Sequence, residues 1–137
     1  MIQYQPAFNP QRKRAPTPRP DYVVKQKDSI RAILDAKYRD LWETKLPREM
    51  LYQLVVYAIS HPEHPESSIL YPTMNPHARE ARISVTDPIH GNHIGQVSLR
   101  PLNLERLQTL VSDSTSRGRH QREIYAHDLT FGCQHSR

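Results

Sequence analysis

Short runs of β-forming residues alternate with polar segments through the middle of the chain, which predicts a sheet built largely from hairpins. The expected strands span residues 21–24, 30–38, 69–72, 81–86 and 94–99. The first two are separated by a short polar segment and the last two have Gly91-Asn92 near their turn, so each pair is predicted to form a hairpin. Ala32, Ile33 and Leu34 are consecutive apolar residues, which is typical of a strand buried in the middle of a sheet.

Two segments have the pattern of helices. Pro47 suits the first turn of a helix, and the residues that follow over 50–59 are apolar around most of the helix, so we expect it to be largely buried. Asn103 can cap an amphipathic helix over residues 104–112, whose apolar residues share one face. Trp42, in the connection before the first helix, is expected to pack back onto the sheet.

The two ends of the chain differ in composition from the middle. Residues 1–19 contain four prolines and a basic cluster, so they are predicted to form an extended, disordered arm. Residues 113–137 are expected to form a polar tail, mobile over 113–123 and with a final strand over 124–131. An ordered core is therefore predicted for residues 20–112.

Composition limits the classes of function. The 137-residue chain has a formal net charge of +5 and a sequence pI of about 9.6, which suits a polyanionic partner such as nucleic acid. No run of 18 apolar residues is present and the N-terminus lacks a secretory signal, so we expect a cytoplasmic protein without a membrane span. The single cysteine excludes an internal disulfide and a cysteine-based zinc site, and the dispersed histidines favour a polar surface over a metal site.

Candidate chemistry is concentrated in the first predicted hairpin. Asp35 and Lys37 lie two residues apart on one strand, so their side chains point to the same face. If the hairpin pairs as predicted, Asp21 lies beside Asp35 at the edge of the sheet. Two adjacent carboxylates favour a hard cation such as Mg²⁺, and a lysine beside them can orient or deprotonate a water molecule and offset charge on a phosphate. Taken alone, an Asp-x-Lys triplet can also be an ion pair on an edge strand.

Gln53 and Tyr57 are four residues apart and share one face of the first predicted helix. Both carry polar groups on an otherwise apolar helix, and a buried amide and phenol need hydrogen-bonding partners. The carboxylate-bearing edge of the sheet would supply such partners. The alternative is that Tyr52 and Gln53 face solvent and that Gln53 and Tyr57 have no part in a site.

These motifs together resemble a known nuclease superfamily. Pro20-Asp21 followed by Asp35-Ala36-Lys37 resembles the PD-(D/E)XK motif, and Gln53-Leu54-Val55-Val56-Tyr57 is similar to the QxxxY helix motif of RecB-like members. More narrowly, residues 20–110 resemble the C-terminal nuclease domain of the McrC family, the endonuclease subunits of McrBC modified-cytosine restriction systems. The segments that carry this narrower resemblance are ILDAKYRD, MLYQLVVYA and ILYP.

The resemblance implies a fold and a set of roles. The fold would be α/β (α+β), a restriction-endonuclease-like mixed sheet flanked by helices, here without the first helix and strand of the usual αβββαβ core. Asp21 and Asp35 would hold Mg²⁺, Lys37 would be catalytic, and Gln53 and Tyr57 would support the site. No residue is singled out for DNA recognition.

The expected function is that of a Mg²⁺-dependent DNA endonuclease, a subunit or fragment of a McrBC-like restriction system. By the resemblance its partners would be DNA and a nucleotide-hydrolysing, McrB-like GTPase motor subunit. A second hypothesis is a truncated, inactive nuclease-fold module that only binds DNA or the motor. A third is a nucleic-acid-binding protein that owes its affinity to the basic arm.

Overall fold

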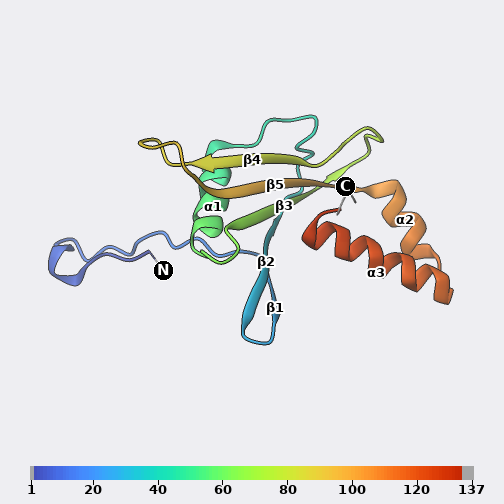
Figure 1. Cartoon of the computed structure of the whole chain (residues 1–137), viewed down its shortest axis with the longest axis horizontal. Helices are drawn as coiled ribbons and strands as arrows, with labels where there is room; N and C mark the ends of the chain where they lie inside the picture. Colours follow the sequence, from blue (N-terminus) through green and yellow to red (C-terminus); the bar gives the residue numbers. More distant parts are fainter. Residues whose placement is uncertain (1, 134–137) are drawn as a thin grey trace.

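The computed structural model describes residues 2–133, which form a five-stranded mixed sheet flanked by three α-helices (Figure 1). The elements in chain order are η1 (Pro6–Phe8), β1 (Tyr22–Gln26), β2 (Ser29–Ala36), α1 (Arg48–Ile59), β3 (Glu66–Thr73), β4 (Ala81–Thr86), β5 (His93–Asn103), α2 (Leu104–Ser112) and α3 (Ser116–Phe131). The α/β fold class expected from the sequence is confirmed. None of the helices described has the length and hydropathy required to cross a bilayer.

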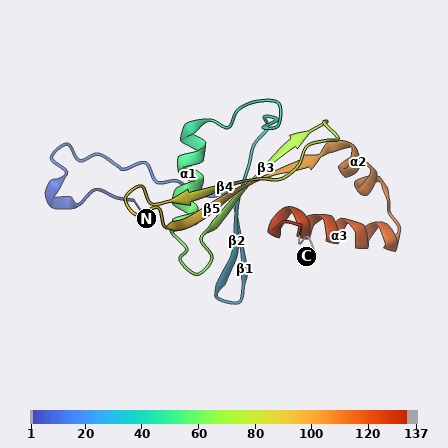
Figure 2. The same cartoon turned by 45° about the horizontal axis from the view of Figure 1, so that its top comes forward.

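The sheet has the strand order β1-β2-β3-β5-β4. Both predicted hairpins are confirmed, because β1 pairs antiparallel with β2 and β4 pairs antiparallel with β5. The two hairpins are joined through β3, which runs parallel to β2 on one side and to β5 on the other. The β1–β2 ribbon projects away from the remaining strands, as two views of the chain show (Figures 1 and 2).

The hydrophobic core lies between α1 and one face of the sheet. Leu54 of α1, Ile69 of β3 and Val97 of β5 are fully buried there. The expectation that α1 is largely buried holds in part: Leu54, Tyr57 and Ala58 are buried, whereas Tyr52 is 62% exposed and Ile59 is 45% exposed. The prediction for Trp42 is wrong: its side chain is 44% exposed, and its neighbour Leu41 packs in the core instead.

The C-terminal tail is helical, which corrects the prediction of a mobile stretch followed by a strand over residues 124–131. The side chain of Thr115 caps α3 by accepting a hydrogen bond from the Gly118 backbone N–H at 3.1 Å. Arg122 donates hydrogen bonds to the backbone carbonyls of Leu110 and Asp113, which ties α3 to the end of α2. The cap and this contact favour a helix over the β-preference of the short apolar run.

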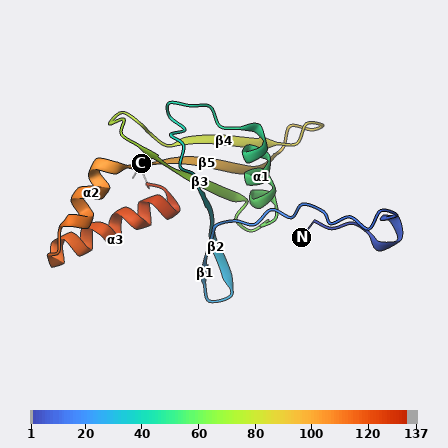
Figure 3. The ribbon, with the colours of Figure 1, turned by 180° about the vertical axis from the view of Figure 1, so that it is seen from behind.

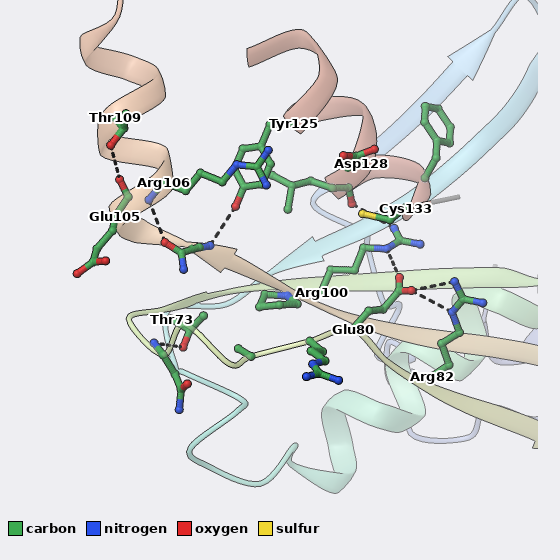
Figure 4. A pocket seen from close by; sticks show the side chains of 17 residues that line it. Thr73, Glu80, Arg82, Arg100, Glu105, Arg106, Thr109, Tyr125, Asp128 and Cys133 are labelled. Carbon is green, nitrogen blue, oxygen red and sulfur yellow. Dashed lines mark hydrogen bonds and ion pairs between the residues drawn. The ribbon is translucent and has the colours of Figure 1, made fainter. Parts of the chain in front are cut away.

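Arg100 anchors α3 to the face of the sheet opposite α1. Its side chain is buried, and its Nε donates to Glu80 at 2.6 Å (Figure 4). Its Nη1 donates to the carbonyls of Leu129 and Thr130 at the end of α3. Burial raises the pKa of Glu80, but hydrogen bonds from Arg100 and Arg82 outweigh this effect and the pKa is lowered. The ion pair therefore stabilises the fold above the ordinary pKa of glutamate and is lost on acidification.

Replacing Arg100 by methionine should reduce the free energy of unfolding by about 3 kcal/mol, because it leaves Glu80 and two helix-terminal carbonyls without their partner. Urea denaturation followed by circular dichroism measures the change. Arg119→Met is the matched control, because its exposed i,i+4 pair with Glu123 is worth less than about 1 kcal/mol. Equal denaturation midpoints for the two variants would contradict the anchoring role.

Candidate active site

The carboxylate pair, Asp21 and Asp35, forms where the arm joins the sheet. Asp21 immediately precedes β1, and the register that pairs Tyr22 with Leu34 places it opposite Asp35 near the end of β2. The backbone N–H of Asp21 donates to Asp35 Oδ1 at 2.9 Å, and the backbone N–H of Ala36 donates to Asp21 Oδ2 at 2.9 Å. The structure thus brings the two predicted acidic residues together, each held by the backbone of the opposite strand.

The electrostatics of the pair favour a cation. Asp35 is 3% exposed, whereas Asp21 is exposed to solvent. Burial raises the pKa of Asp35, and the negative charge of Asp21 adds to this effect. The hydrogen bond from the Asp21 N–H and the positive charge of Lys37 oppose the rise without cancelling it. A divalent ion at this position would relieve both the burial of charge and the repulsion.

Lys37 lies just beyond β2, which ends at Ala36 and not at residue 38 as predicted. Its backbone N–H donates to the Leu70 carbonyl of β3 at 3.0 Å, so the extended geometry of the strand continues through it. The alternation of side chains then places Lys37 on the same face as Asp35. The effect of Lys37 on the pKa of Asp35 agrees with this placement.

Gln53 and Tyr57 face this end of the sheet from α1. Gln53 Nε2 donates to the Tyr57 hydroxyl oxygen at 2.6 Å. Tyr57 is buried, and its pKa is raised first by that burial and further by the charges of Asp35 and Asp21, while the Gln53 hydrogen bond opposes the rise. Tyr57 therefore remains a neutral hydroxyl beside the carboxylate pair. The alternative in which Gln53 faces solvent is not what the structure shows, because Gln53 is half-buried and Tyr52 is the exposed neighbour.

Tyr71 of β3 is a residue near the site that the sequence did not single out. Because Asp35 pairs with Ile69 in the parallel register, Tyr71 two residues further along lies on the same face and beside Lys37. It is buried, and burial together with the charge of Asp40 raises its pKa to about 12. Tyr71 lies in the β-forming run over residues 69–72, but its position relative to the site can be interpreted only once the β2–β3 register is known.

The donor set of the carboxylate pair fits Mg²⁺. Among residues 2–133 no group of three or more His, Cys, Asp or Glu side chains is placed to hold a metal ion, so an all-protein cage does not fit. Mg²⁺, by contrast, commonly binds through one or two carboxylates and completes its shell with water and substrate phosphate. Asp21 Oδ1 and Asp35 Oδ2 accept no hydrogen bond from the described residues and are free to act as such ligands.

A cleft of about 1220 Å³ lies elsewhere, between the sheet and the α2–α3 hairpin (Figure 4). None of the predicted site residues lines it. Several of its charged groups are engaged within the protein: Glu80 binds both Arg82 and Arg100, and Arg106 stacks over the Tyr125 ring at 4.5 Å. Charged residues that line the cleft therefore help to hold α3 against the sheet, and the cleft is separate from the candidate active site.

No family model, curated protein or solved structure matches this chain. The candidate site therefore stands on the geometry around Asp21, Asp35 and Lys37 and on the order of motifs in the sequence.

Proposed function

We propose that the chain is a cytoplasmic, Mg²⁺-dependent DNA endonuclease of the PD-(D/E)XK type. The proposal rests on two reciprocal hydrogen bonds that hold Asp21 beside Asp35. The Asp21 N–H donates to the Asp35 carboxylate, and the Ala36 N–H donates to the Asp21 carboxylate. Lys37 follows on the same face, and Gln53 and Tyr57 approach from α1. These are the five residues that the nuclease motifs single out.

The arrangement suits hydrolysis of a phosphodiester. Bound Mg²⁺ would supply positive charge to the phosphate oxygens at Asp21 and Asp35. The ammonium of Lys37 would orient the attacking water and donate to a phosphate oxygen as negative charge develops on it. The water oxygen would bond to phosphorus as the water releases one proton to solvent, one ester P–O bond would break, and the departing oxygen would take a proton from solvent. The neutral Tyr57 hydroxyl, held by Gln53, adds a hydrogen-bond donor on the α1 side.

We further propose a motor partner. The resemblance to McrC supports dependence on a nucleotide-hydrolysing, McrB-like GTPase that delivers the nuclease to DNA. The net charge of +5 supports DNA as the substrate, because basic residues release counterions from phosphates.

A second candidate function is a nuclease-fold module that binds DNA or the motor without cleaving it. The exposed basic arm favours it, since those side chains can bind phosphates without the carboxylate pair. The two functions differ in their dependence on metal, which makes them separable.

Nicking of supercoiled plasmid DNA by the purified chain should require Mg²⁺ and stop with EDTA. Mg²⁺ at ten times its dissociation constant should also stabilise the fold by about 1.4 kcal/mol, which raises the melting temperature by a few degrees. Asp21→Asn, purified identically, is the control and should lose both effects. Metal-independent DNA binding without nicking or a thermal shift would contradict the nuclease proposal and favour the binding module.

A further inference from the structure

The positive charge of this chain is concentrated in the arm, residues 2–19. Four basic side chains lie in this segment, Arg12, Lys13, Arg14 and Arg19, and no acidic residue accompanies them. Residues 20–137 contain fifteen basic and fourteen acidic residues, a formal net charge of only +1. The arm therefore accounts for most of the electrostatic attraction that the protein can exert on a polyanion.

The four basic side chains are available for binding. All four are exposed, and none forms an ion pair with another residue of the described part of the chain. Figures 1 and 3 show the arm extending away from the sheet and doubling back near η1. The reversal is held by Asn9, whose side chain bonds both the carbonyl and the N–H of Lys13, and by a hydrogen bond from Thr17 to the Ile2 carbonyl.

Two aromatic rings accompany the basic residues. Phe8 in η1 is 77% exposed and Tyr4 is 45% exposed, although an apolar ring gains stability by burial. Exposed rings together with basic side chains on one segment are a combination that binds single-stranded nucleic acid: unpaired bases stack on the rings while the cations contact the phosphates. Duplex DNA offers no free base faces for such stacking.

The arm is joined directly to the carboxylate pair. Asp21 follows Arg19 after one proline, and its backbone N–H is bonded to Asp35. Arg14 is seven residues from Asp21, a reach of at most about 25 Å at 3.3–3.6 Å per residue. A strand bound at Arg14 therefore lies within about 25 Å of the carboxylate pair along the chain.

From these observations we infer that the arm binds a single DNA strand and holds it within about 25 Å of the carboxylate pair. The bases stack on Phe8 and Tyr4, and the phosphates contact Arg12, Lys13 and Arg14. The substrate is then DNA with an unpaired segment beside the bond to be cleaved. The role of the arm in cleavage rests on the proposed nuclease function, whereas its binding of the strand does not.

Binding of a fluorescent 20-nucleotide DNA strand tests the inference, with the Asp35→Asn protein in EDTA so that neither cleavage nor metal affects the result. Neutralising the cluster (Arg12→Gln, Lys13→Gln, Arg14→Gln) should weaken binding about 100-fold at 0.1 M salt and make the log–log salt slope shallower by about 2, since each phosphate contact contributes about 0.7. Phe8→Ala should weaken binding about tenfold.

The matched control removes the same charge elsewhere on the surface: Lys25→Gln, Arg117→Gln and Arg119→Gln, all exposed and outside the arm. The control should retain affinity within a few-fold. Equal losses in the two triple variants, or unchanged binding by Phe8→Ala, would overturn the inference. The binding assay contains no metal and does not depend on cleavage. Absence of nicking by the wild-type chain in the plasmid assay would therefore reject the nuclease proposal and leave the binding result intact.

Discussion

Asp35→Asn should lower the rate of DNA cleavage by at least about 10³-fold and, at the same time, stabilise the metal-free protein. The loss of rate follows because a metal ion supplies several kcal/mol of transition-state stabilisation, and each 1.36 kcal/mol is a factor of ten. Asparagine keeps the oxygen that accepts the Asp21 N–H, so the ribbon end remains paired. Only the charge is removed.

The gain in stability follows from the pKa of Asp35, which burial and the charge of Asp21 raise. The folded state then binds the proton more tightly than the unfolded state, so stability falls as the pH rises through the folded pKa. At neutral pH the ionised carboxylate opposes folding, and asparagine removes that cost. As the pH falls toward the unfolded pKa, both states become protonated and the difference in stability between wild type and variant should shrink.

Single-turnover cleavage with Mg²⁺ at pH 7 measures the first effect of Asp35→Asn. Urea denaturation in EDTA, at pH 7 and again near pH 4, measures the second. Asp28→Asn is the control, because Asp28 is exposed in the β1–β2 turn and should change neither quantity. Undiminished cleavage by Asp35→Asn, or a metal-free variant less stable than the wild type, would contradict the role assigned to the carboxylate pair.

Lys37→Ala should lower cleavage by about 10²–10⁴-fold, the usual range for a group that orients or transfers protons, while thermal stabilisation by Mg²⁺ is retained. The pKa of Asp35 should rise further without the ammonium, so any residual activity should require a higher pH. Rate–pH profiles and melting curves with Mg²⁺ separate these effects. Lys25→Ala, exposed on β1, is the control.

The variants also identify a contaminating nuclease. Equal nicking by the wild type, Asp35→Asn and Lys37→Ala would show that the activity does not belong to this chain. Loss of the Mg²⁺-induced thermal shift in Lys37→Ala would show that Lys37 supports metal binding and not the hydrolysis step itself.

Local patterns in the sequence were sufficient for the hairpins and for α1 and α2. The predicted β1–β2 pairing placed Asp21 beside Asp35 because a short turn fixes which residues face each other. The tail was misjudged, since the cap by Thr115 and the contact of Arg122 with the end of α2 outweigh local β-propensity. Tyr71 was missed because its position beside Lys37 depends on a parallel pairing of strands separated by α1, which no local pattern encodes.

The reciprocal hydrogen bonds between Asp21 and the end of β2 have a consequence for the dynamics of the chain. Fraying of only a few residues at this end of the ribbon would break both bonds and separate the two acidic groups, while the buried strands and α1 stay folded. Cation affinity at this position is thus coupled to a local opening equilibrium and not to global unfolding. A ligand or partner that binds the arm therefore shifts this opening equilibrium directly.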